Sequence, residues 1–209
     1  MKNRGFSLVE LMVVLALFAL LMLAVAPSVS AWLVNLRIRN AADSLLNGLQ
    51  TARNEAIRRN RTVGFWLVSA STPAVLANTC TLSSTSASWV VSGSDPTGAC
   101  ASAPSTTTAP LLVASHPVGD GSAGSIAVSA VLADGSSAAA SVRFNGFGQP
   151  VAETATGAAA ATAPIGRIDI QNASNPGNFR SLRIVLAGSG AIRLCDPAPT
   201  VAASDPRYC

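Results

Sequence analysis

The first 60 residues carry a helical pattern of apolar positions that changes half-way along. Positions 11–26 are apolar without a break and directly follow one acidic residue, Glu10. Beyond Pro27, apolar residues recur at spacings of mainly three and four, which predicts an amphipathic helix. We expect the following apolar residues to pack under a sheet: Val29, Trp32, Leu33, Leu36, Leu45, Leu49, Ala52, Ala56 and Ile57. The pattern predicts one helix from Phe6 to about Asn60, kinked at Pro27 because proline has no N–H for a helical hydrogen bond.

Beyond the helix the pattern changes to that of β-strands. The runs that we predict as strands are 62–68, 88–91, 111–114, 125–132, 140–145, 165–170, 180–186 and 191–194. Residues 140–145 alternate cleanly before an Asn-Gly turn signal, and a glycine-rich turn joins the last two runs. The segments 69–110 (in part) and 152–164 are rich in Ala, Ser, Thr and Gly, and we expect surface loops there. The fold class is therefore α+β, a long N-terminal helix packed on an antiparallel sheet.

Composition narrows the range of partners and of redox environments. Charged residues make up 11% of the 209 residues, and the formal net charge of +4 is too small to indicate nucleic-acid binding by itself. The four cysteines are Cys80, Cys100, Cys195 and Cys209, with no Cys-x-x-Cys pair. Widely spaced cysteines behind an export segment indicate two disulfides. Three pairings are open, and nearest-neighbour pairing is the simplest.

No catalytic or metal-binding constellation stands out. The single histidine, His116, precedes a proline in a loop-like stretch, and one histidine cannot complete a common zinc site. Asp95, Asp120 and Asp134 lie beside or near Gly or Pro, where turn chemistry explains them better than calcium binding does. We expect no enzyme activity, no cofactor and no metal.

The N-terminus allows three interpretations. Residues 1–4 form a short basic leader, and 24–26 have the small-x-small shape of a secretory cleavage site, although a proline follows directly. A plain membrane anchor would leave Glu10 unexplained, since an acid at that depth is costly. A prepilin-type signal would be cut after Gly5. The new amine of Phe6 would then lie close to Glu10, and the carboxylate could pair with a neighbouring subunit's amine.

Residues 5–12 resemble the signal of type IV pilins and type II secretion pseudopilins. The resemblance implies cleavage by a prepilin peptidase after Gly5, N-methylation of Phe6, and an assembly role for Glu10. It also implies a single pass through the inner membrane, a periplasmic C-terminal domain, entry into a pilus or pseudopilus, and other pilins as partners. The expected parts are a leader (1–5), a transmembrane and assembly helix (6–27), an amphipathic helix half (28–61) and a β-rich domain with a disulfide-tied tail (62–209).

Three inner motifs resemble the GspH/FimT branch of this superfamily. They are a helix-end signature at 52–60, a strand and turn at 142–150, and a closing hairpin formed by 182–186 and 190–195. The resemblance implies a minor pilin or an H-type pseudopilin, a structural subunit in pilus biogenesis or protein secretion. The sequence does not decide between the two machines, nor the position in the fibre.

DNA binding is the alternative function. Strand alternation turns four arginines away from their apolar neighbours, toward solvent if their strands share one sheet, and a Cys195–Cys209 bond would bring a fifth close. These candidate DNA-binding residues are Arg143, Arg167, Arg183, Arg193 and Arg207. FimT-type proteins of some naturally competent bacteria are implicated in DNA uptake through a Gly-Arg-x-Arg motif. Here the matching residues run from Gly190 to Arg193, with Ala191 in place of the first arginine, which is compatible with a purely priming subunit.

Overall fold

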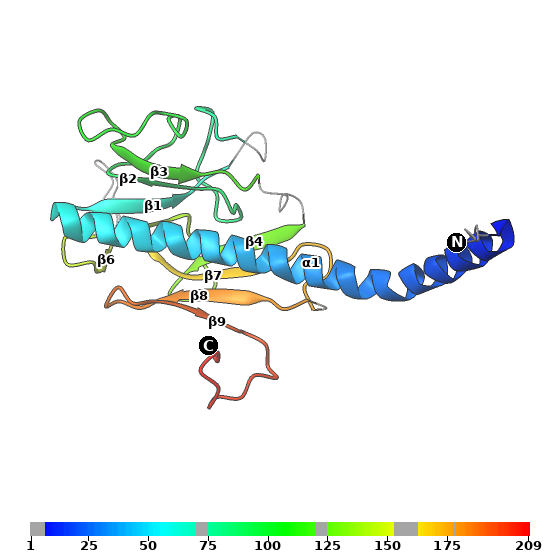
Figure 1. The fold of residues 1–209 in the computed structure, drawn as a ribbon. Coiled ribbons are helices and arrows are strands. Elements are labelled where there is room, and N and C mark those ends of the chain that lie inside the picture. Colours follow the sequence, from blue (N-terminus) through cyan, green and yellow to red (C-terminus); the bar gives the residue numbers. More distant parts are fainter. Residues whose placement is uncertain (1–6, 70–74, 120–124, 153–162, 178) are drawn as a thin grey trace, which may run out of the picture.

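The fold begins with one helix that is much longer than the domain it carries (Figure 1). The computed structural model describes residues 7–69, 75–119, 125–152, 163–177 and 179–209. Helix α1 (Leu8–Arg59) has 52 residues and ends at Asn60, which takes the left-handed conformation (φ 47°) and donates its N–H to the helix. Its segments Leu8–Leu23 and Ser28–Arg59 meet at 44°. The sequence places Pro27 at this bend, as the kink prediction requires.

Within the described residues, nine strands follow in two antiparallel sheets. The first sheet contains β1 (Val63–Leu67), β2 (Trp89–Ser92), β3 (Leu112–His116), β5 (Ser141–Phe144) and β6 (Pro150–Val151), in the order β3-β2-β1-β5-β6. The second contains β4 (Ile126–Leu132), β7 (Ile165–Asn172), β8 (Leu182–Leu186) and β9 (Ile192–Cys195), in the order β4-β7-β8-β9. All eight predicted strands are present and β6 is additional. The α+β class is confirmed, with the strands divided between two sheets.

The division arises from strand pairing. Strand β4 pairs with β7 over seven positions, whereas β5, the next strand after β4, pairs with β1. One edge of β4 is thus hydrogen-bonded to β7, a strand that begins more than thirty residues later in the chain. Alternation within a strand shows which face is apolar but not which strand lies beside it, so the sequence did not predict two sheets.

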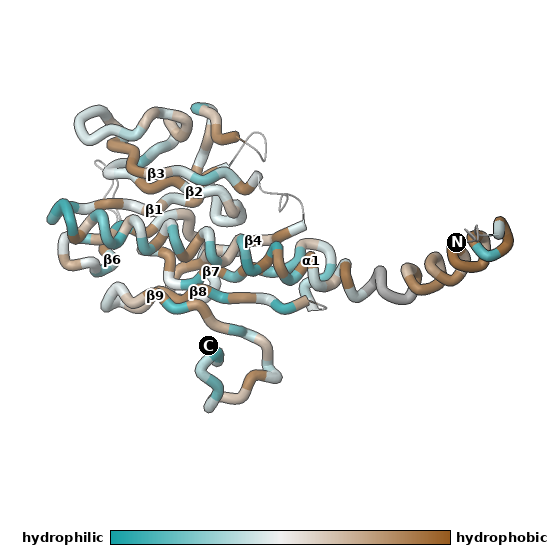
Figure 2. Tube along the Cα trace, viewed as in Figure 1, coloured by the Kyte–Doolittle hydropathy of each residue, from teal (hydrophilic) through white to brown (hydrophobic). Residues whose placement is uncertain are grey.

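Helix α1 lies across both sheets and supplies one side of the core. Its buried face begins at Ile38 and continues through Leu45, Leu49, Ala52 and Ala56, all at most 1% exposed. The helix approaches the first sheet so closely at Gly48 that a Cβ there would lie 2.7–2.9 Å from the rings of Phe65 and Trp89. Figure 2 shows the same helix changing from mainly apolar near the N-terminus to alternating polar and apolar along the domain.

Two parts of the predicted buried stripe were wrong. Val29, Trp32, Leu33 and Leu36 are 41–61% exposed, and Ile57 is 45% exposed. The reason is helical geometry. Leu36 and Leu45 are nine residues apart, which is about 2.5 helical turns, so they lie on opposite sides of α1. The sheets cover the side of Leu45, and the side of Leu36 is left open.

The outer face of the first sheet carries a second small core. Trp66, Val68 and Val90 point away from α1 and pack with Leu76, Leu112 and the Cys80–Cys100 disulfide. Part of the segment that we expected to form a surface loop therefore covers a sheet face instead. All five residues of β1 are buried, so both faces of this strand are covered by other parts of the chain. Of the second predicted loop, 152–164, residues 153–162 lie outside the described part of the chain.

Candidate functional site

The first half of α1 is an exposed apolar surface with one acid. From Leu8 to Leu23 every described side chain is exposed, and only Glu10 is charged. Glu10 forms no ion pair with another described residue. Gly5 and Phe6, the predicted processing residues, lie outside the described residues. An acid on an apolar helix costs free energy in a membrane or a protein interior unless it finds a partner.

A candidate membrane span in α1 requires two segments taken together. Within the described residues, neither straight segment is by itself long and apolar enough to cross a bilayer. The bent pair Leu8–Leu23 and Ser28–Arg59 does meet the length and composition of a span.

The three inner motifs meet at the far end of α1. Arg53 on the helix donates from Nε to the carbonyl oxygen of Gly148, in the turn between β5 and β6, at 3.1 Å. Gly190, in the turn between β8 and β9, packs against the same carbonyl, because a Cβ at Gly190 would lie only 1.9 Å from that oxygen. Gly148 and Gly190 both have positive φ, 74° and 84°. One carbonyl group thus joins the helix, the first sheet and the second sheet.

The helix end is fixed further by polar contacts. A Cβ on Gly146 would lie 2.4 Å from Oδ1 of Asn60, so the turn after β5 touches the helix cap directly. Glu55 accepts hydrogen bonds from Arg58 and from Arg59. The bonds from Arg58, and then those from Arg59, lower the pKa of Glu55 despite partial desolvation. This end of α1 is therefore a structural junction between the elements.

The predicted DNA-binding arginines do not form one free array. Arg143 lies on the first sheet and is half-buried, away from the other four. Arg167 and Arg183 share one carboxylate, Asp169, at 2.9 and 2.6 Å. Arg193 is exposed. The premise that the four strand arginines share one sheet was wrong, because β5 pairs with β1. DNA binding itself stays a prediction.

The C-terminal tail folds back on β9. Cys195 is bonded to Cys209, so both disulfides follow nearest-neighbour pairing. Arg193 Nη2 donates to the Cys209 carbonyl oxygen at 3.4 Å. In the tail, the Arg207 carbonyl oxygen also accepts a hydrogen bond from the backbone N–H of Asp196 at 2.7 Å. Hydrogen bonds from the Arg207 guanidinium and backbone lower the pKa of Asp205 to about 2.

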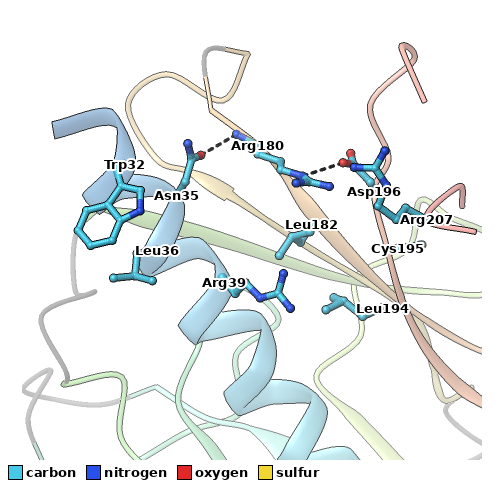
Figure 3. Close-up of a pocket in the computed structure, with 10 residues that line it drawn as sticks. All are labelled: Trp32, Asn35, Leu36, Arg39, Arg180, Leu182, Leu194, Cys195, Asp196 and Arg207. Atoms are coloured by element: carbon cyan, nitrogen blue, oxygen red, sulfur yellow. Dashed lines mark hydrogen bonds and ion pairs between the residues drawn. The ribbon is translucent and has the colours of Figure 1, made fainter. Parts of the chain in front are cut away.

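A groove of about 380 Å³ lies between α1, the two last strands and this tail (Figure 3). Its apolar lining includes Trp32, Leu36, Leu182 and Leu194, and its cationic lining is Arg39, Arg180 and Arg207. Arg180 is fixed twice, since its backbone N–H donates to Asn35 and its Nε donates to Asp196, both at 2.9 Å. The sequence did not reveal this groove, because the apolar period predicts Trp32 and Leu36 as core residues.

His116 and two of the aspartates predicted in turns make local contacts that support the fold. His116 stacks on the ring of Trp89, and its Nδ1 lies 3.4 Å from the hydroxyl of Ser44. Asp95 accepts from the N–H of Thr97. Asp134 accepts from two following backbone N–H groups, and hydrogen bonds to Ser137 and Ser136 lower its pKa to about 2. Of the three aspartates predicted in turns, Asp95 and Asp134 are turn residues, and Asp120 lies outside the described residues.

A helix that carries an exposed apolar first half and packs its second half on antiparallel sheets is the layout of pilin-like proteins. The family model described as Type II transport protein GspH matches residues 41–190, more than two-thirds of the chain. The model described as Prokaryotic N-terminal methylation motif matches residues 1–26. The chain therefore belongs to the GspH family. It is a minor pilin or pseudopilin, a structural subunit of the type IV pilus or type II secretion system.

Among solved structures the chain is similar to the type IV minor pilin FimU of Pseudomonas aeruginosa (strain PAO1) in two crystal forms. In the P21 form the identity is 16%, with 77% of this chain and 92% of FimU covered and a TM-score of 0.45. In the P65 form the identity is 15%, with 76% and 96% covered and a TM-score of 0.42. No curated protein sequence matches the chain.

Proposed function

We propose that this subunit is anchored in the inner membrane by the first half of α1 and enters a fibre through the same surface. A prepilin peptidase would remove residues 1–5, and Phe6 would become the methylated N-terminus. The C-terminal domain would then lie in the periplasm, an oxidising compartment that suits two disulfides. The partners would be other pilins or pseudopilins of the same machine.

The observation that carries this proposal is Glu10, one exposed acid in the otherwise apolar first half of α1, Leu8–Leu23. In a bilayer or a helix bundle, the carboxylate gains most from a cation held at a fixed place. The amine of Phe6 on an adjacent subunit provides that cation after cleavage at Gly5. Pairing offsets the desolvation of both groups and fixes the axial register between subunits.

Replacing Glu10 tests the proposal directly. We expect Glu10→Ala to abolish incorporation into the fibre while the protein still inserts into the membrane, because the apolar helix is unchanged. Immunoblots of sheared fibres and of washed membranes measure the two properties. Masses of the wild-type subunit should show the loss of residues 1–5 and the gain of one methyl group.

Asp43→Asn is the matched control, because Asp43 is another exposed acid on the same helix, about half accessible. It should enter fibres at the wild-type level. Normal incorporation of Glu10→Ala would overturn the role of Glu10. A mature N-terminus at or beyond Pro27 would overturn the pilin-type anchor altogether.

A further inference from the structure

We propose that the groove between α1, β8–β9 and the C-terminal tail binds the headgroup of an anionic phospholipid. This inference rests on the proposed membrane anchoring of α1. The lipid would be one from the periplasmic leaflet of the membrane that holds the subunit before assembly. The ligand class is defined by an apolar floor beside several guanidinium groups (Figure 3).

The lining has the chemistry of a phosphate site next to an apolar chain. Three guanidinium groups contribute to it, from Arg39, Arg180 and Arg207, against one lining carboxylate, Asp196. Asp196 is 6% exposed and already accepts from Arg180 and from the N–H of Ala198. The planar guanidinium fork matches the oxygens of a phosphate, and its charge strengthens the hydrogen bonds.

The other acids nearby are held outside the lining. Arg39 pairs with Asp43 at 3.7 Å, with both side chains more than half exposed. Arg207 pairs with Asp205 at 2.6 Å, and both side chains are partly accessible to solvent. Solvent-accessible ion pairs are weak, so a headgroup phosphate can share or replace them. Arg180 presents the rest of its guanidinium while its Nε stays on Asp196.

The groove also lies at the height of a membrane surface. From Leu8 to Trp32 the helix rises about 36 Å, at about 1.5 Å per residue. A hydrocarbon core is about 30 Å thick, with headgroups adding several ångströms on each side. Trp32 therefore falls in the headgroup layer, where tryptophan is enriched in membrane proteins, and it is 61% exposed here.

A neighbouring subunit's helix fits the groove less well. The described part of α1 from Leu8 to Leu23 offers one carboxylate, Glu10, whereas the groove presents three guanidinium groups. An apolar helix laid over them would remove water from the arginines without supplying acceptors, which costs free energy. A lipid supplies both parts at once, with its phosphate for the arginines and its upper acyl chain for Leu36 and Leu182.

Tryptophan fluorescence of the full chain in lipid nanodiscs tests the proposal. Trp66 is fully buried and Trp89 is 5% exposed, so Trp32 is the tryptophan that responds to its surroundings. We would raise the fraction of phosphatidylglycerol in phosphatidylcholine discs and follow protection of Trp32 from acrylamide, a neutral quencher that an anionic surface does not repel. The wild type should gain protection with phosphatidylglycerol, and Trp32→Phe should remove the response.

Two charge-neutralising variants on the same helix separate a site from general surface attraction. Arg39→Gln should require about fivefold more phosphatidylglycerol for the same protection, the effect of losing one basic contact near an anionic surface. Arg37→Gln should stay close to the wild type, because Arg37 is exposed and does not line the groove. Equal shifts for the two variants would overturn the site.

Each failure has its own signature. A chain that inserts into discs but shows the same Trp32 protection with and without phosphatidylglycerol would overturn the lipid site alone. Protection that depends on the number of subunits in a disc would assign the groove to a second copy and overturn the lipid. A chain that does not enter discs at all would overturn this inference and the proposed anchor together.

Discussion

At the scale of single residues, the carbonyl of Gly148 explains why three separate sequence motifs occur in one chain. It accepts from Arg53 and lies in contact with Gly190. Each of the three positions belongs to a different motif, on the helix, the β5–β6 turn and the β8–β9 turn. The motifs thus describe one junction, in which glycine is needed for close approach as well as for positive φ.

Gly190→Ala should destabilise the domain strongly. The new Cβ would meet the Gly148 oxygen at 1.9 Å, and the backbone there has φ +84°, which L-residues rarely adopt. We expect a loss of about 1–3 kcal/mol from strain alone, and more from the displaced turn. Chemical denaturation followed by circular dichroism measures this free energy of unfolding.

Gly188→Ala is the control in the same turn, since a Cβ there meets nothing within 4 Å. Its effect should stay within about 0.5 kcal/mol, as for ordinary surface changes. Equal effects of the two variants would show that the Gly148–Gly190 contact does not form.

Acid should loosen the C-terminal tail at an unusually low pH. Asp205 has a folded pKa of about 2, below its ordinary 3.8, because Arg207 donates hydrogen bonds to its charged form. A lowered pKa gives a contribution that is complete above about pH 4 and is lost as the pH falls toward 2. Tyr208, the chain's one tyrosine, reports on the tail by NMR. Its ring signals should titrate near pH 2, and Asp205→Asn should remove this step. A midpoint near 3.8 would contradict the pairing.

At the scale of elements, α1 combines three surfaces along its length. Leu8–Leu23 is exposed and apolar on all described sides, the next two turns are apolar on the side away from the sheets, and only from Ile38 is one face buried in the core. The opposite face becomes polar after Leu36, beginning with Arg39 and Asn40. The exposed surface of the helix thus changes from apolar to polar over a short length, at the level of the groove.

The two disulfides should differ in their response to reductant. Cys80 and Cys100 are both buried in the small core beside Trp66, whereas Cys209 is partly exposed. Access limits thiol–disulfide exchange, so Cys195–Cys209 should be reduced several-fold faster. Alkylation and mass spectrometry during mild reduction give the order. Replacing Cys195 and Cys209 by serine should cost about 3 kcal/mol, the chain-entropy value for a loop of this length. Earlier loss of Cys80–Cys100 would contradict the buried cluster.

At the scale of the whole molecule, the anchor and the junction lie at opposite ends of α1 (Figure 1). The exposed apolar half carries Glu10, and the far end carries Arg53 and the two glycine turns. Because α1 packs against strands of both sheets, it is the element that holds them together. The proposed assembly through Glu10 and the stability given by the Gly148 junction should therefore change independently, so their tests use different measurements.

The sequence by itself predicted the helix and strands, and it indicated Glu10 as the candidate assembly residue. The period of apolar residues gave α1 and eight strands, since that period follows from backbone geometry within each element. The GspH and methylation-motif matches confirm the family. A short motif such as residues 5–12 can be recognised from the sequence because its residues are contiguous in the chain. The acid at Glu10 was visible because a single charge in an apolar run has no local explanation.

Only the tertiary structure decided which surfaces are covered and which are open. It divided the strands between two sheets, placed Trp32 and Leu36 on the open side of α1, and used part of 69–110 to cover Trp66. It also brought Arg53, Gly148 and Gly190 to one carbonyl. These features depend on contacts between residues far apart in the chain. A local pattern of polar and apolar positions does not predict them, because it indicates that a face must be buried but not which element buries it.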